Sequence, residues 1–107
     1  MTVQAADPDA RSAPLRVLVV DDEPPICQFV SRVLEAGGYR VTTAGDGAAA
    51  IAAVAEKGPP DLLLTDLKMP QMNGDELAAR LRRDVPDLKV LYYTGFSRAL
   101  FDNRGLL

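Results

Sequence analysis

Short apolar runs alternate with longer amphipathic segments along most of the chain. Segments at 17–20, 62–65 and 89–93 are four or five residues long and mostly apolar, and the first two stop at acidic residues. An unbroken apolar run of this length is typical of a strand that is buried on both faces. A further β-prone segment lies at 39–43. The pattern therefore predicts four short strands.

The segments between these strands predict helices at 24–36, 46–57 and 75–83. Two prolines open the first helix, where a missing N–H costs nothing, and Gly37 and Gly38 end it. Asp46 is a predicted N-cap for the second helix. Ser97 can cap a short helix that runs to about Asn103. Apolar side chains recur at helical spacing in the first helix at Ile26, Phe29, Val30, Val33 and Leu34.

Strands that alternate with helices predict an α/β fold with a doubly wound parallel sheet, because right-handed crossovers place each helix over the sheet. A chain of 107 residues is long enough for one hydrophobic core and too short for two ordinary domains. Residues 1–14 are rich in Ala, Asp and Pro without periodicity, which predicts a disordered tail. The ordered domain is predicted at 15–107.

Oxygen-bearing side chains follow three of the four predicted strands. Asp21 and Asp22 come after the first strand, Asp66 after the third and Thr94 after the fourth. In a parallel sheet these strand ends lie side by side, and the active crevice lies at that edge. Clustered carboxylates repel one another unless a cation neutralises them, and oxygen ligands suit Mg²⁺. The sequence predicts a metal-assisted phosphoryl site.

Composition narrows the chemistry further. The chain has 12 Lys and Arg against 15 Asp and Glu, so it has no basic surplus for direct binding to nucleic acid. It contains no histidine, which excludes Ser-His and Cys-His dyads and means that a partner must supply any phosphohistidine. The single cysteine, Cys27, is interpreted as a small buried hydrophobe. No membrane-spanning run or secretory signal is found, and a cytoplasmic protein is expected.

Three stretches, LRVLVVDDEPPICQFV, PDLLLTDLKMPQMNG and LKVLYYTGFS, occur in this order at 15–30, 60–74 and 88–97. Together they resemble the first, third and fourth strand regions of the response-regulator receiver domains of bacterial two-component signalling, and the resemblance covers Arg16 to about Asn103. The resemblance implies a flavodoxin-like sheet in the order 2-1-3-4. It also implies a phosphoacceptor module that takes a phosphoryl group from a histidine kinase or histidine phosphotransfer protein.

The resemblance assigns a role to each site residue. Asp66 is the nucleophile that forms an acyl phosphate. Asp22 binds Mg²⁺ directly, Asp21 binds it largely through water, and Asp66 and the backbone carbonyl of Lys68 complete the protein ligands. Thr94 donates its hydroxyl to a phosphoryl oxygen. Any catalysis is then limited to the domain's own phosphorylation and dephosphorylation, without turnover of small substrates.

The sequence departs from the family pattern at its C-terminal end. Receivers carry a lysine at the end of a fifth strand, and this sequence stops at Leu107 before such a strand and its helix. The departure keeps open an alternative function, a pseudo-receiver that cannot be phosphorylated and acts through protein contacts. It also predicts an unprotected apolar strand edge at 90–93, through which two copies of the chain would pair as a homodimer.

Two other interpretations fit less well. A phosphatase of the haloacid-dehalogenase kind has a second aspartate two residues after its nucleophile, whereas Lys68 follows Asp66 and Glu23 follows Asp21 at that spacing. The stretch at 45–50 matches the loose dinucleotide pattern G-x-G-x-x-A, but it follows the second strand rather than the first. A glycine-flanked N-cap at Asp46 explains that stretch better.

Overall fold

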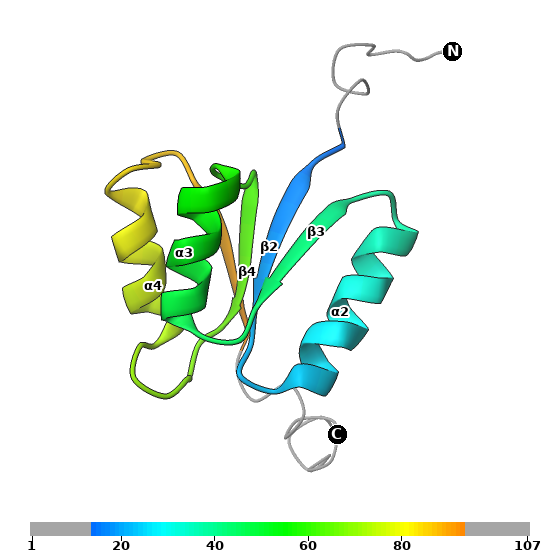
Figure 1. The fold of residues 1–107 in the computed structure, drawn as a ribbon, viewed down its shortest axis with the longest axis horizontal. Helices are drawn as coiled ribbons and strands as arrows, with labels where there is room; N and C mark the ends of the chain where they lie inside the picture. Colours follow the sequence, from blue (N-terminus) through cyan, green and yellow to red (C-terminus); the bar gives the residue numbers. More distant parts are fainter. Residues whose placement is uncertain (1–13, 94–107) are drawn as a thin grey trace.

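A parallel sheet lies between helices on both of its faces in the computed structural model, which describes residues 14–93 (Figure 1). Helix α2 covers one face, and α3 and α4 cover the other. The elements are β2 (Arg16–Val20), α2 (Pro24–Ala36), β3 (Arg40–Ala44), α3 (Gly47–Lys57), β4 (Leu62–Asp66), α4 (Gly74–Arg82) and β5 (Lys89–Tyr93).

The strands lie in the order β3-β2-β4-β5, and every neighbouring pair is parallel. This is the predicted α/β fold with the flavodoxin-like order 2-1-3-4. The register pairs Val20 with Thr65 and Asp66 with Tyr93, so β2, β4 and β5 end close to one another. The residues that follow β2 therefore face the end of β4 across one edge of the sheet.

The central strand β2 divides the core into two halves. Leu18 and Val20 pack toward α3 and α4 in a cluster that includes Leu63, Leu77 and Leu81. Val17 and Val19 pack on the other face with Cys27 of α2. Successive side chains of a strand point to opposite faces, so an unbroken apolar run is needed to fill both halves. Cys27 is a free, buried thiol, as predicted.

Local sequence signals set the helix ends. Pro residues occupy the first positions of α2, and Gly38 after its end has a φ of 95°, which favours glycine. The Asp46 side chain accepts a hydrogen bond from the backbone N–H of Ala49 at 2.8 Å. The N-cap interpretation of the stretch at 45–50 is therefore confirmed.

Helix α2 buries a narrower stripe than its sequence pattern predicts. Phe29 and Val33, which belong to the predicted apolar stripe, are 54% and 55% exposed. The helix meets the sheet through Cys27, Val30 and Leu34 instead, because a single helix can turn only one stripe toward one sheet face. Smaller corrections are that β3 begins one residue later than predicted, and α4 one residue earlier.

Several predictions concern residues outside the described range. Thr94, the helix predicted from Ser97 to Asn103, and residues 1–13 of the predicted tail all lie there. Within residues 14–93, β5 pairs with β4 alone and leaves Leu91 and Tyr92 exposed. Pairing of two copies through this edge stays a prediction. None of the described helices is long and apolar enough to cross a membrane.

Candidate functional site

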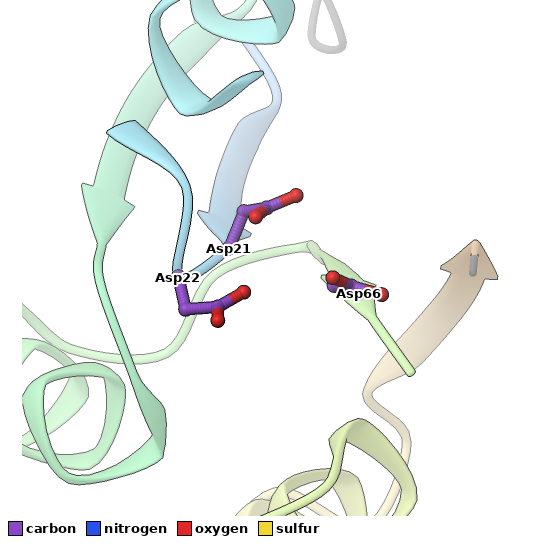
Figure 2. Close-up of side chains that lie close together, drawn as sticks. All are labelled: Asp21, Asp22 and Asp66. Carbon is purple, nitrogen blue, oxygen red and sulfur yellow. The ribbon is translucent and has the colours of Figure 1, made fainter. Parts of the chain in front are cut away.

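Three aspartates meet at the carboxyl edge of the sheet (Figure 2). Asp21 and Asp22 follow β2 directly, and Asp66 is the last residue of the neighbouring strand β4. One carboxylate oxygen from each lies within 4.8 Å of the others. The parallel register brings the two strand ends to the same level, which is why residues far apart in sequence form one cluster.

Asp21 is held firmly at this edge. Its side chain is buried, with an exposed fraction of 3%. Its Oδ1 accepts a hydrogen bond from the backbone N–H of Glu23 at 2.8 Å, and its Oδ2 accepts one from the Tyr93 hydroxyl at 2.7 Å. Its own N–H donates to the carbonyl of Ala44 at 3.2 Å. The carboxylate therefore has a protein donor on each oxygen.

Asp66 is fixed mainly through its backbone. Its carbonyl accepts a hydrogen bond from the Thr65 hydroxyl at 2.9 Å, and the next N–H, that of Leu67, donates to the Tyr93 carbonyl at 2.6 Å. The side chain is 8% exposed, and its Oδ1 accepts a 3.3 Å hydrogen bond from the N–H of Lys68. The strand end is thus rigid, while the carboxylate keeps oxygen lone pairs for a further partner.

Charge is concentrated at this edge. Burial raises the pKa of Asp21, and the carboxylates of Asp22 and Glu23 raise it further, against the hydrogen bonds from Tyr93 and Glu23 that lower it. Burial is also the main cause of the raised pKa of Asp66, followed by the neighbouring Asp21 carboxylate. The ionised cluster is therefore unfavourable by itself, and a bound cation would relieve it.

The cluster fits a small divalent cation by its own geometry. Mg²⁺ takes oxygen ligands at 2.0–2.1 Å, which puts neighbouring ligand oxygens about 3 to 4 Å apart. The oxygens of Asp21, Asp22 and Asp66 are already near that spacing. Asp22 is exposed, so water can complete the coordination from the solvent side. The described residues can therefore hold Mg²⁺ with modest side-chain adjustment.

The structure brings together most of the site that the sequence predicts. Asp21, Asp22 and Asp66 form one cluster, and Lys68 adjoins it through its N–H. The backbone carbonyl of Lys68 as a metal ligand stays a prediction, and so does the role of Thr94, which lies outside the described residues.

Two residues at the site were not predicted from sequence. The sequence pattern predicts for Tyr93 only a place on an apolar edge strand, yet its hydroxyl contacts Asp21. Gly74 opens α4, and a side chain there would collide with the Asp66 carbonyl. The sequence does contain a signal for each residue. Tyr93 ends a predicted strand whose neighbour ends at an acid, and Gly74 follows Asp66 by eight residues.

Comparison with known proteins identifies the family. A family model described as "Response regulator receiver domain" matches residues 17–104. The chain belongs to the response regulator receiver family of two-component systems. This receiver domain is 45% identical to the probable transcriptional regulatory protein TcrX of Mycobacterium tuberculosis over 85 residues, which are 79% of this chain and 36% of TcrX. The chain thus spans about a third of that relative's length.

A second relative and a solved structure agree with the assignment. The response regulator receiver protein CpdR of Brucella abortus is 43% identical over 82 residues, which cover 77% of this receiver domain and 68% of CpdR. The crystal structure of the response regulator TrrA from Thermotoga maritima, in complex with Mg(2+)-BeF, has a TM-score of 0.70 and 35% identity. That match covers 79% of this chain and 73% of TrrA.

The electrostatics of the receiver site predict opposite responses to acid with and without Mg²⁺. Folding raises the pKa values of Asp21 and Asp66. At a pH between the unfolded and the folded pKa of each group, the folded state therefore binds more protons than the unfolded state. Without metal, the contribution of these two groups to the free energy of unfolding therefore increases as pH falls from neutral toward about 4. Mg²⁺ needs the ionised carboxylates, so its stabilisation is lost over the same range.

Thermal unfolding followed by circular dichroism tests this at pH 7 and pH 5, with NaCl matching the ionic strength of the Mg²⁺ samples. At ten times its dissociation constant, Mg²⁺ is expected to stabilise the domain at pH 7 by about 1.4 kcal/mol. The increase in unfolding midpoint should be smaller at pH 5. An equal increase at both pH values would contradict the assignment of the cation to these carboxylates.

Proposed function

We propose that this receiver domain takes a phosphoryl group onto Asp66 in a Mg²⁺-dependent reaction. The observation that supports it best is the cluster of Asp21, Asp22 and Asp66, whose oxygens lie within 4.8 Å of one another at the carboxyl edge of the sheet. In α/β sheets of this kind, ligands bind at that edge. The TrrA complex with Mg(2+)-BeF supports the same kind of site in a relative that shares this fold.

In the proposed reaction, an oxygen of the Asp66 carboxylate attacks phosphorus and forms a new P–O bond. The bond between phosphorus and the donor atom breaks, and the donor leaves with its electron pair. A carboxylate is already a nucleophile when ionised, so no general base is needed. Phosphoryl transfer depends chiefly on positioning and on neutralisation of charge. The buried end of β4 positions the Asp66 carboxylate, and Mg²⁺, when bound, would neutralise charge.

Each neighbouring group has a separate task in this proposal. Asp22 ligates Mg²⁺ directly and Asp21 largely through water, and the backbone carbonyl of Lys68 is a further ligand. The N–H of Lys68 orients the Asp66 carboxylate through their 3.3 Å hydrogen bond. Thr94 follows β5 in the sequence and donates its hydroxyl to a phosphoryl oxygen.

The proposed donor is a phosphohistidine on a separate protein, a histidine kinase or a histidine phosphotransfer protein. The chain contains no histidine and therefore cannot carry that group itself. We place the exchange in the cytoplasm. A homodimer through the exposed side of β5 is compatible with it, because the acidic cluster lies at the end of the sheet rather than along that strand.

Intact-mass spectrometry after incubation with acetyl phosphate tests the proposal without a partner protein. The expected result is a single added phosphoryl group in the presence of Mg²⁺ and none when EDTA removes the metal. An acyl phosphate should also be lost under mild base. A folded sample that gains no phosphoryl group would instead support the pseudo-receiver, which has the fold but acts only through protein contacts.

A further inference from the structure

Tyr93 links strand β5 to the acidic cluster through its side chain. Its hydroxyl donates a 2.7 Å hydrogen bond to Oδ2 of Asp21, 72 residues earlier in the sequence. Tyr93 lies on β5 and Asp21 follows β2, so the phenol ring reaches across the end of β4. Neighbouring strands are about 4.8 Å apart, so the long Tyr93 side chain and the Asp21 side chain together span the two strand spacings. The contact joins strands that are not direct neighbours in the sheet.

We propose that Tyr93 is a positioning residue that fixes the Asp21 carboxylate and thereby increases the affinity of the site for Mg²⁺. The inference rests on the metal site of the proposed function, but it concerns a residue to which the receiver resemblance assigned no role. Tyr93 itself does not ligate the cation in this account. It acts through Asp21.

Two hydrogen-bond donors hold the Asp21 carboxylate, one on each oxygen. The N–H of Glu23 holds Oδ1 at 2.8 Å, and Tyr93 holds Oδ2 at 2.7 Å. One donor on each oxygen fixes the plane of the carboxylate, whereas a single donor leaves it free to rotate about its terminal bond. Each oxygen keeps a second lone pair for a cation or for cation-bound water. The hydroxyl therefore orients the ligand without using up its capacity to bind.

A second contact ties Tyr93 to the other half of the site. Its backbone carbonyl accepts the 2.6 Å hydrogen bond from Leu67, the residue directly after Asp66, and its Cα is paired with that of Asp66 in the sheet. Tyr93 thus touches the segment that carries Asp66 through its backbone and touches Asp21 through its side chain. One residue of β5 is therefore hydrogen-bonded to both segments that carry the acidic cluster.

The test is the Mg²⁺ dissociation constant of Tyr93→Phe, measured by NMR titration of backbone amide signals. The substitution keeps the ring and removes only the hydroxyl. Loss of a group that orients a metal ligand typically weakens metal binding about tenfold or more. The Mg²⁺ dissociation constant of Tyr93→Phe is therefore expected to rise about tenfold. Tyr92→Phe is the matched control, because Tyr92 precedes it on β5 and is exposed. Its Mg²⁺ affinity should equal that of the unmodified chain.

The Asp21→Asn background separates positioning from a general structural effect. If Tyr93 acts through Asp21, adding Tyr93→Phe to Asp21→Asn should weaken Mg²⁺ binding no further. An unchanged dissociation constant in Tyr93→Phe would overturn the inference, and so would an equal loss in both backgrounds. The phosphoryl assay is independent. If the unmodified chain is phosphorylated but Tyr93→Phe binds Mg²⁺ normally, only the positioning role is refuted. If Tyr93→Phe weakens Mg²⁺ binding but the unmodified chain is not phosphorylated, only the proposed function is refuted.

Discussion

Asp66→Asn is expected to abolish phosphoryl uptake from acetyl phosphate while the domain stays folded. Asparagine has nearly the same volume, and its side-chain oxygen can still accept the hydrogen bond from Lys68. It lacks the charged oxygen that attacks phosphorus. Because burial raises the pKa of Asp66, removal of its charge should also stabilise the metal-free domain slightly at pH 7. Intact mass and thermal unfolding measure the two effects.

Asp61→Asn is the matched control for this variant. Asp61 precedes the opposite end of β4, where its Oδ2 accepts a 2.8 Å hydrogen bond from the N–H of Arg16. Asparagine can accept that bond too, so the fold is preserved. This variant should gain the phosphoryl group to the same extent as the unmodified chain. A persistent adduct on folded Asp66→Asn would show that the acceptor is another residue.

Gly74→Ala is expected to produce the largest loss of stability among the changes considered near the site. A Cβ at this position would collide with the backbone carbonyl of Asp66 and lie 3.0 Å from Cγ2 of Thr65. Neither neighbour can move easily, because both belong to the buried end of β4. Overpacking of this kind costs about 1–3 kcal/mol. Urea unfolding should show that loss, and Mg²⁺ binding should weaken because Asp66 is displaced.

Gly45→Ala separates this collision from a general effect of replacing glycine. Gly45 lies in the loop after β3, at the same carboxyl edge of the sheet, but a Cβ there would meet nothing within 4 Å. The variant should unfold within about 0.5 kcal/mol of the unmodified chain. If Gly74→Ala is equally mild, α4 does not pack against Asp66 as closely as the structure indicates.

The sequence predicted the fold because its strongest signals are local. The run from Val17 to Val20 has no polar position, and in the structure all four residues are buried between two helix layers. The acids at the strand ends were predictable for a related reason. Parallel strands end at the same edge, so Asp21 and Asp66 meet whatever the details of the side-chain packing.

The remaining features depend on contacts between distant parts of the chain. The hydrogen bond from Tyr93 to Asp21 needs the strand order, the register and the direction of one ring, and periodicity supplies none of these. The close approach of Gly74 to Asp66 depends on how the loop after β4 returns to the sheet. The exposure of Phe29 follows from where α2 meets the sheet, which hydrophobic spacing within the helix does not determine.

Mapping the modified residue shows whether Asp66 carries the phosphoryl group. Borohydride reduces an aspartyl phosphate to homoserine with release of phosphate, which leaves a stable mark for peptide mass spectrometry. After treatment with Mg²⁺ and acetyl phosphate, homoserine is expected at position 66 and at no other aspartate. Homoserine at Asp21 or Asp22, or a phosphoryl group that survives on a serine, threonine or tyrosine, would contradict the account.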